Sequence, residues 1–245
     1  MSVGLGSLPT MSTFVLVPGA WLGAWAWDDL VPGLRAAGHA TYPLSLSGLA
    51  DKRDVPPETI GQQTHVADIV DLIERHDLRD VILAGHSYAG IPVGQAAERI
   101  GDRLARVVFL DANLPVDGAS FASDWSEAGQ AWLNDQLAEG GGYWPPREAS
   151  DYAEQDLTDE QIERIVAGST PHPGRPLLEP AVLARPLGEL PATFLDCALS
   201  GETGDTVAGL LTSDSWELVT METGHWPMFS QPKALTEILL SIAES

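Results

Sequence analysis

Two short segments of this 245-residue chain carry side chains that could perform acyl transfer. The first is Ala84-Gly85-His86-Ser87-Tyr88-Ala89-Gly90, which sets one serine among small residues, and the second is Thr223-Gly224-His225-Trp226-Pro227, near the C-terminus. A serine hydroxyl is a weak nucleophile until a base within hydrogen-bond reach accepts its proton. We therefore interpret Ser87 as a candidate nucleophile and His225 as its candidate general base. His86, beside the serine, is expected to point away from it, because side chains alternate along a strand.

The residues around Ser87 favour a sharp turn between a strand and a helix. An apolar run at 81–84 precedes the serine, and a helical pattern follows from about 89 to 100. Such a turn needs small neighbours because its backbone packs tightly, and Gly85, Ala89 and Gly90 supply them. Alanine at position 89 departs from the strict G-x-S-x-G pattern. A serine in this place can also be a helix N-cap, so the motif alone does not decide.

A second turn could supply hydrogen-bond donors for the same chemistry. The first strand-like run ends in Pro18-Gly19-Ala20-Trp21, a glycine turn at the carboxyl end of a strand. We predict that the backbone N–H groups of Ala20 and Tyr88 form an oxyanion hole, because the residue after the nucleophile and an early loop usually provide the two donors. The alternative is a plain Pro-Gly turn.

The elements that must position these residues alternate along the chain. Strand-like runs rich in β-branched residues and leucine lie at 13–17, 40–44, 81–84, 105–110, 192–198 and 216–221. Most are apolar on both faces, as parallel strands covered by helices are. Helical stripes with i, i+3, i+4, i+7 spacing run over 66–73 and 235–242. The fold class predicted is α/β, with a doubly wound, mainly parallel six-stranded sheet.

One region breaks the alternation and predicts an insertion. Residues 117–186 contain no convincing buried strand, but they hold a triple glycine at 140–142, a short helical stripe and seven prolines that would divide it. We interpret 117–186 as an inserted helical cap on a core made of 12–116 and 187–245. Residues 1–11 are interpreted as a flexible N-terminal lead-in.

Composition excludes several classes of partner. Thirty-five acidic and thirteen basic residues give a net charge of −22, which disfavours binding to nucleic acid or anionic membranes. Cys197 is the single cysteine, so no intrachain disulfide can form, and no apolar run reaches the roughly 18 residues of a membrane span. We predict a cytoplasmic protein. No metal or cofactor is predicted, because neither H-E-x-x-H, paired cysteines nor G-x-G-x-x-G occurs.

Five segments together resemble a known superfamily: FVLVPGAWLGAWAW, AGHSYAG, VVFLDANLPVDG, STPHP and ETGHWPMFSQP. They are similar to α/β-hydrolases, in particular to the methylesterase and hydroxynitrile-lyase-like branch. The resemblance runs from about Phe14 to the end and is specific around Ser87 and His225. It implies the α/β-hydrolase fold. This branch usually has histidine where Pro18 stands, so one side chain of the pocket is absent here.

The carboxylate that should orient His225 is not where the resemblance implies it. The branch places an aspartate three residues beyond the position of Cys197, and this chain has Ser200 there. Glu202 and Asp205 lie nearby and would require a shifted loop. Asp111 ends the strand after the nucleophile helix, in a pattern similar to that of some haloalkane dehalogenases. We predict Asp111 as the acid, and leave Glu202, Asp205 and the absence of an acid open.

The function predicted is hydrolysis of a small-molecule carboxylic ester through an acyl-enzyme. The predicted substrate pocket consists of Trp21, Trp132, Trp144 and Trp226. Related hydroxynitrile lyases carry lysine directly after the catalytic histidine, where this chain has Trp226, so cyanide chemistry is disfavoured. Lactonase, decarboxylase or other lyase, and polyketide-tailoring activities stay open, as does a ligand-binding relative without turnover. A homodimer also stays open.

Overall fold

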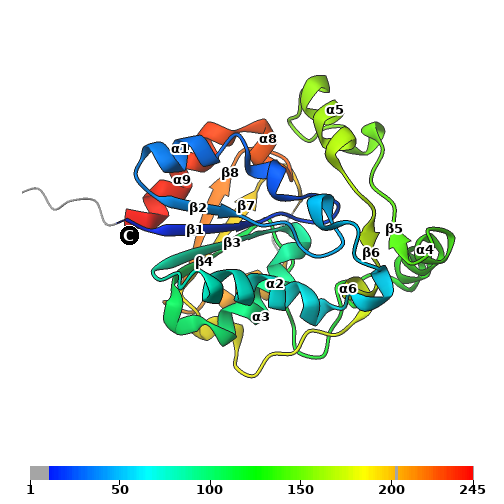
Figure 1. Cartoon of the computed structure of the whole chain (residues 1–245), viewed down its shortest axis with the longest axis horizontal. Helices are drawn as coiled ribbons and strands as arrows, with labels where there is room; N and C mark the ends of the chain where they lie inside the picture. The colour runs from blue at the N-terminus through cyan, green and yellow to red at the C-terminus, as the bar shows by residue number, and fades with distance from the viewer. Residues whose placement is uncertain (1–10, 202–203, 245) are drawn as a thin grey trace, which may run out of the picture.

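The computed structural model describes residues 11–201 and 204–244, and it shows a parallel sheet covered by helices on both faces (Figure 1). Its six strands are β1 (Thr13–Val17), β2 (Ala40–Pro43), β3 (Val81–His86), β4 (Leu104–Leu110), β7 (Ala192–Cys197) and β8 (Trp216–Met221). Their order is β2-β1-β3-β4-β7-β8, and every pair is parallel. The predicted six-stranded parallel sheet is confirmed. Of the predicted lead-in 1–11, all but Met11 lies outside the described residues.

The helices divide between the two faces of this sheet (Figure 1). One face is covered by α1 (Val31–Ala36), α8 (Pro227–Ser230) and α9 (Pro232–Glu244), the other by α2 (Gln62–Arg75) and α3 (Gly90–Arg99). Strand alternation separates two cores: Phe14 packs in the cluster that holds Leu235, whereas Val15 packs in the cluster that holds Val66. Both predicted helical stripes therefore face the sheet. No helix among the described residues is long and apolar enough to cross a bilayer.

Most of residues 117–178 lie beyond one end of the sheet, and residues 179–186 return along α3, where the Arg185 N–H donates to Glu98 (Figure 1). The segment contains α4 (Glu127–Glu139), β5 (Tyr143–Trp144), α5 (Asp159–Gly168), β6 (His172–Pro173) and α6 (Arg175–Leu178). The segment was expected to be mostly helical, but α4, α5 and α6 contain only 13, 10 and 4 residues. In addition, β5 and β6 pair antiparallel, and both residues of β6 are buried. A two-residue strand is too short to produce a period, which is why its pattern predicted no strand. One further helix, α7 (Asp205–Leu210), joins β7 to β8.

Candidate active site

Ser87 occupies a strained turn between β3 and α3. Its φ is +53°, a left-handed conformation that a residue with a Cβ adopts only where its surroundings enforce it. A Cβ on Gly85 would lie 2.8 Å from Val93, and one on Gly90 would lie 2.3 Å from the carbonyl oxygen of Asn113. Neither position has room for a side chain. The backbone N–H of Asn113 donates to the Ser87 carbonyl at 3.0 Å, which ties the turn to the loop after β4.

The loop after β1 lies directly against this turn. A Cβ on Gly19 would lie 2.7 Å from the Cβ of Ser87 and 2.9 Å from Nδ1 of His86, so only glycine fits there. The next residue, Ala20, lines the same cavity as Ser87. Tyr88, the residue that follows the serine, is fully buried. The loop that holds Ala20 therefore contacts Ser87, and Tyr88 directly follows it; that their N–H groups form an oxyanion hole stays a prediction.

His225 follows β8 and is bound to Asp111, which follows β4. Its Nδ1 lies 2.5 Å from Oδ2 of Asp111, and the two side chains are 26% and 12% exposed. The backbone N–H of His225 donates to Oε1 of Gln155 at 2.8 Å. With Nδ1 engaged by a carboxylate, Nε2 is the ring nitrogen left for a substrate or nucleophile. Both His225 and Ser87 line one cavity, whose volume is about 440 Å³.

The carboxylate of Asp111 is held in its charged form. Partial burial raises its pKa. The hydrogen bond and charge of His225, together with the polar side chain of Ser200, lower the pKa by more, so it lies below the ordinary 3.8. Ser200, the position where the resemblance expected the acid, donates its hydroxyl to the Cys197 carbonyl at 2.9 Å and lines the same cavity as Asp111. Of the alternatives, Asp205 is exposed at the first residue of α7, and Glu202 lies outside the described residues.

His86 belongs to the site, although strand alternation predicted that it points away from Ser87. Its ring lies 4.7 Å from the ring of His225, and its Nε2–H donates to the His225 carbonyl at 2.7 Å. Burial, then the nearby charge of His225, lowers the pKa of His86 to about 3, so it is neutral near pH 7. The positive φ of Ser87 ends the alternation one residue later, which explains why both side chains line one cavity.

The predicted pocket tryptophans Trp21, Trp132, Trp144 and Trp226 all line this cavity. The rings of Trp21 and Trp144 are 4.2 Å apart, and both are buried, whereas Trp132 is 48% exposed. The structure adds Phe121, Trp125 and Arg147 to the wall. The Arg147 guanidinium stands 5.5 Å from the ring centre of Trp21. No sequence pattern marked Arg147, since it contacts Trp21 across more than a hundred residues.

The sequence pattern described as "Alpha/beta hydrolase family" matches residues 14–238. The chain belongs to this family. Putative methylesterase 12, chloroplastic, of Arabidopsis thaliana is 27% identical over 252 residues, which cover 94% of this hydrolase and 71% of that protein. The predicted resemblance to the methylesterase branch is confirmed.

Two further comparisons describe how the similarity is distributed. Carbendazim hydrolyzing esterase of Nocardioides sp. (strain SG-4G) is 39% identical over 110 residues, so the match spans 45% of this chain and less than half, 46%, of that esterase. An extracellular alpha/beta-hydrolase from a Paenibacillus species has a TM-score of 0.82 at 22% identity, covering 96% of this chain and 100% of that one. At that identity the structural likeness shows the fold alone.

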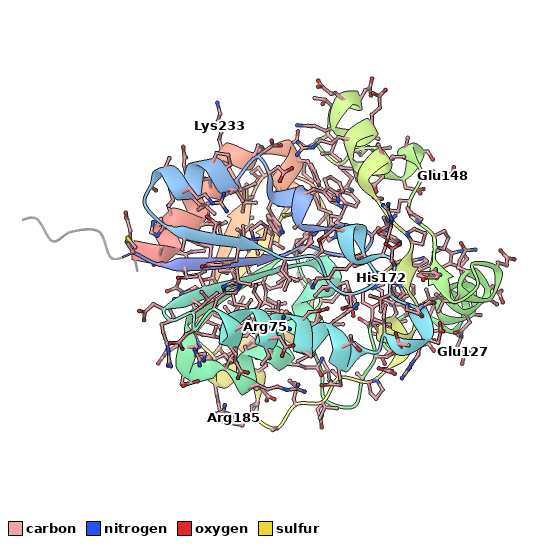
Figure 2. All side chains as sticks on the ribbon, in the orientation of Figure 1. Arg75, Glu127, Glu148, His172, Arg185 and Lys233 are labelled. Atoms are coloured by element: carbon pink, nitrogen blue, oxygen red, sulfur yellow. The ribbon has the colours of Figure 1, made fainter. Side chains whose placement is uncertain are left out.

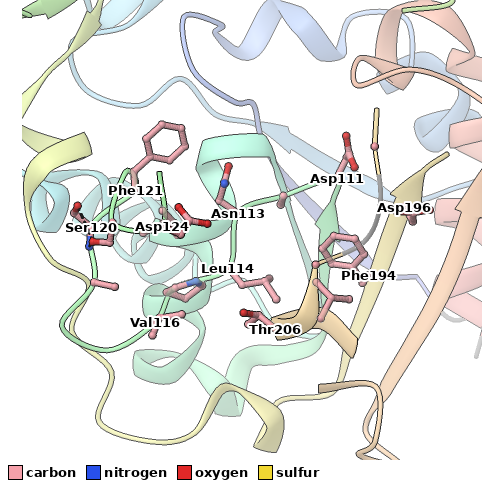
Figure 3. A pocket seen from close by; sticks show the side chains of 18 of the residues that line it. Asp111, Asn113, Leu114, Val116, Ser120, Phe121, Asp124, Phe194, Asp196 and Thr206 are labelled. Carbon is pink, nitrogen blue, oxygen red and sulfur yellow. Dashed lines mark hydrogen bonds between the residues drawn. The ribbon is translucent and has the colours of Figure 1, made fainter. Parts of the chain in front are cut away.

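The hydrolase has a second cavity, of about 450 Å³, with Asp111 in its wall (Figure 3). Its wall includes Phe194, Asp196 and Asp124, and Phe121 lines both cavities. Neither Ser87 nor His225 borders it, so the groups that could react lie in the first cavity. Among the residues that the structure describes, no three histidine, cysteine or acidic side chains form a group that could hold a metal ion.

Proposed function

We propose that this hydrolase cleaves small carboxylic esters through an acyl-enzyme on Ser87. The observation that carries the proposal is the 2.5 Å bond between His225 and Asp111 beside a cavity that also holds the strained Ser87. A nucleophile, a base and a carboxylate that orients the base are the three parts of a serine-hydrolase triad. Relatives named esterase and methylesterase support ester hydrolysis as the reaction.

The proposed reaction uses the residues that line this cavity together with Asp111. Ser87 Oγ attacks the carbonyl carbon of the ester while Nε2 of His225 accepts its proton, and the carbonyl π electrons move to the oxygen. The N–H groups of Ala20 and Tyr88 bind that oxyanion. When the C–O bond to the alcohol breaks, Nε2 returns the proton to the leaving oxygen. Water then attacks the acyl-enzyme by the same steps and releases the acid and free Ser87.

The cavity supports a substrate with a planar aromatic or compact apolar group. Its volume, about 440 Å³, falls within the range of roughly 300–1,000 Å³ that small-molecule sites occupy. Six aromatic side chains line it: Trp21, Phe121, Trp125, Trp132, Trp144 and Trp226. Such rings bind flat aromatic groups by stacking and by edge-to-face contact. The proposed substrate is therefore the ester of an aromatic or short aliphatic acid.

Residues 117–186 are proposed to act as a cap over this cavity. They supply Phe121, Trp125, Trp132, Trp144 and Arg147 to its wall, whereas the sheet core supplies Ser87 and His225. This division is the basis for treating the segment as the part that selects the substrate. A cytoplasmic location, a homodimer and the lack of nucleic-acid or membrane partners stay predictions from the sequence.

The test is turnover and labelling of one serine. We expect the wild type to hydrolyse members of a panel of short p-nitrophenyl and methyl esters, and Ser87→Ala to abolish hydrolysis. Mass spectrometry after fluorophosphonate treatment should locate one adduct on Ser87. Ser241→Ala, at an exposed position of α9, is the matched control and should keep full activity. A wild type that binds an aromatic acid but cleaves no ester would contradict the proposal.

A further inference from the structure

His172 lies at the junction between the 117–186 segment and the sheet core. Figure 2 draws it within the outline of the molecule, while Arg185 and Lys233 lie at the edge. The side chain has no solvent exposure, and neither Ser87 nor His225 is among its contacts. Its neighbours include Tyr88, which is itself a proposed oxyanion donor, and Trp21, which follows the other proposed donor, Ala20. Its ring lies 4.7 Å from the ring of Tyr88, and its Nδ1 lies 3.5 Å from the backbone nitrogen of Trp21.

Every polar group of Trp21 is bound by the same segment. The backbone N–H donates to His172, the carbonyl accepts from the N–H of Thr170 at 2.9 Å, and the indole N–H donates to the Trp144 carbonyl at 3.2 Å. Trp21 needs this support because its φ is +65°, a conformation that costs free energy for a residue with a side chain. Holding the peptide between Ala20 and Trp21 limits rotation of the preceding peptide, whose N–H belongs to Ala20.

The second donor is held from the other side of Tyr88. The Tyr88 hydroxyl donates to Nδ1 of His65 at 2.9 Å, and Nε2–H of His65 donates to the Ser47 carbonyl at 2.9 Å. The rings of Tyr88, His65 and His172 form a triangle: Tyr88 lies 5.8 Å from His65 and 4.7 Å from His172, and the two histidine rings are 5.8 Å apart. His172 therefore contacts Tyr88 and also Trp21, the residue after Ala20, so it adjoins both proposed oxyanion donors.

The chemistry of His172 agrees with a role for its Nδ1. Because that nitrogen accepts a hydrogen bond, the ring proton is on Nε2, and Nε2 has no hydrogen-bond partner among the described residues. Burial, then the charge of His65, lowers the pKa of His172 well below 6.5, so the ring stays neutral and Nδ1 keeps its lone pair. Phenylalanine could fill the same space without an unpaired N–H. What histidine has and phenylalanine lacks is Nδ1, which accepts the hydrogen bond from the Trp21 N–H.

We propose that His172 is a positioning residue that sets the Ala20 and Tyr88 amides for the oxyanion, linking the 117–186 segment to the oxyanion hole. The inference rests on the proposed function. Because the oxyanion exists only as the carbonyl is attacked, a misplaced donor weakens binding of the transition state more than binding of the ester. The loss should therefore fall on kcat, with little effect on KM.

Three variants separate this role from simple packing. His172→Phe keeps a ring but removes the acceptor, and we expect kcat to fall by about 10- to 100-fold, the range that a small misplacement produces, with KM within about threefold. His172→Asn places an oxygen near the position of Nδ1 and should restore kcat to within about fivefold of the wild type. His172→Gln, of the same chemistry but with its oxygen one carbon farther out, should stay low.

A transition-state readout completes the test. Affinity for a trifluoromethyl ketone, which places an oxyanion in the hole as a serine adduct, should fall in parallel with kcat/KM across the three variants. If His172→Phe does not fold, the Asn and Gln variants still decide the question. An equal kcat in His172→Asn and His172→Gln, or an effect of these substitutions on KM alone, would overturn the proposed role of His172. If wild-type Ser87 neither reacts with fluorophosphonate nor cleaves any ester, the proposed function fails instead.

Discussion

Acid should destabilise this protein through His65, which is completely buried and neutral. Burial is the main cause that lowers the pKa of His65 from 6.5 to about 4, and Lys52 lowers it further. The Ser47 carbonyl, Asp68 and Glu179 oppose the shift without cancelling it. The unfolded chain therefore takes up a proton on this histidine near pH 6.5, while the folded protein does so only near pH 4. Stability is complete above pH 6.5 and falls as the pH drops toward 4.

The size of the effect follows from the pKa difference. Each pH unit below 6.5 costs about 1.4 kcal/mol, so His65 removes about 2 kcal/mol by pH 5 and about 3 kcal/mol by pH 4. A typical domain has only about 5–15 kcal/mol in total. The buried His86, whose pKa is lowered to about 3, adds a loss of the same sign over the same range.

The assay compares wild type with His65→Gln by urea unfolding, followed by tryptophan fluorescence at pH 7 and pH 5. Glutamine does not titrate, so the variant is less stable at pH 7 but loses about 2 kcal/mol less on acidification. The gap between the two proteins should narrow by that amount. His76→Gln, at an exposed position, serves as the control for exchanging histidine for glutamine. A gap of equal size at both pH values would refute the claim that His65 is buried in neutral form.

Three further variants, one of them with an added rescue substitution, test the site. Asp111→Asn should lower kcat about 10³- to 10⁴-fold with an unchanged circular dichroism spectrum, because the amide no longer favours the working tautomer of the imidazole. Adding Ser200→Asp to this variant should recover part of the lost kcat, whereas full activity in Asp111→Asn would exclude Asp111 as the acid. Trp132→Ala should raise KM for an aromatic ester about tenfold in steady-state assays, because the ring lines the cavity. Its Tm should stay within about 2 °C of the wild type, because the ring is 48% exposed. An unchanged KM would show that Trp132 does not contact the substrate. Gly19→Ala should lower kcat at least tenfold, because its Cβ would lie 2.7 Å from that of Ser87, and a fully active variant would mean that the loop moves freely.

The strands, helices and motifs that follow from local residue patterns were predictable from the sequence. The contacts between segments far apart in the sequence were not. Runs of β-branched residues located all six strands, and the two short motifs led to Ser87 and His225. The bonds from Trp21 to Thr170 and His172 join residues about 150 positions apart. No local pattern encodes such a pair. The predicted direction of His86 was wrong because side-chain alternation along β3 stops at the turn where Ser87 has a φ of +53°.

The position of the acid follows from the order of the sheet. Strands β4 and β7 are neighbours, with Leu110 paired to Leu195, and the Asp111 N–H donates to the Leu195 carbonyl at 2.7 Å. Side chains at the ends of two adjacent parallel strands meet at the same edge, so either strand can present a carboxylate to one imidazole. Asp111 and Ser200 line the same cavity, so the two positions lie close together. A carboxylate at the end of β4 can therefore replace one beyond β7 with His225 still in place, because the imidazole needs an oriented negative charge and not a particular loop to supply it.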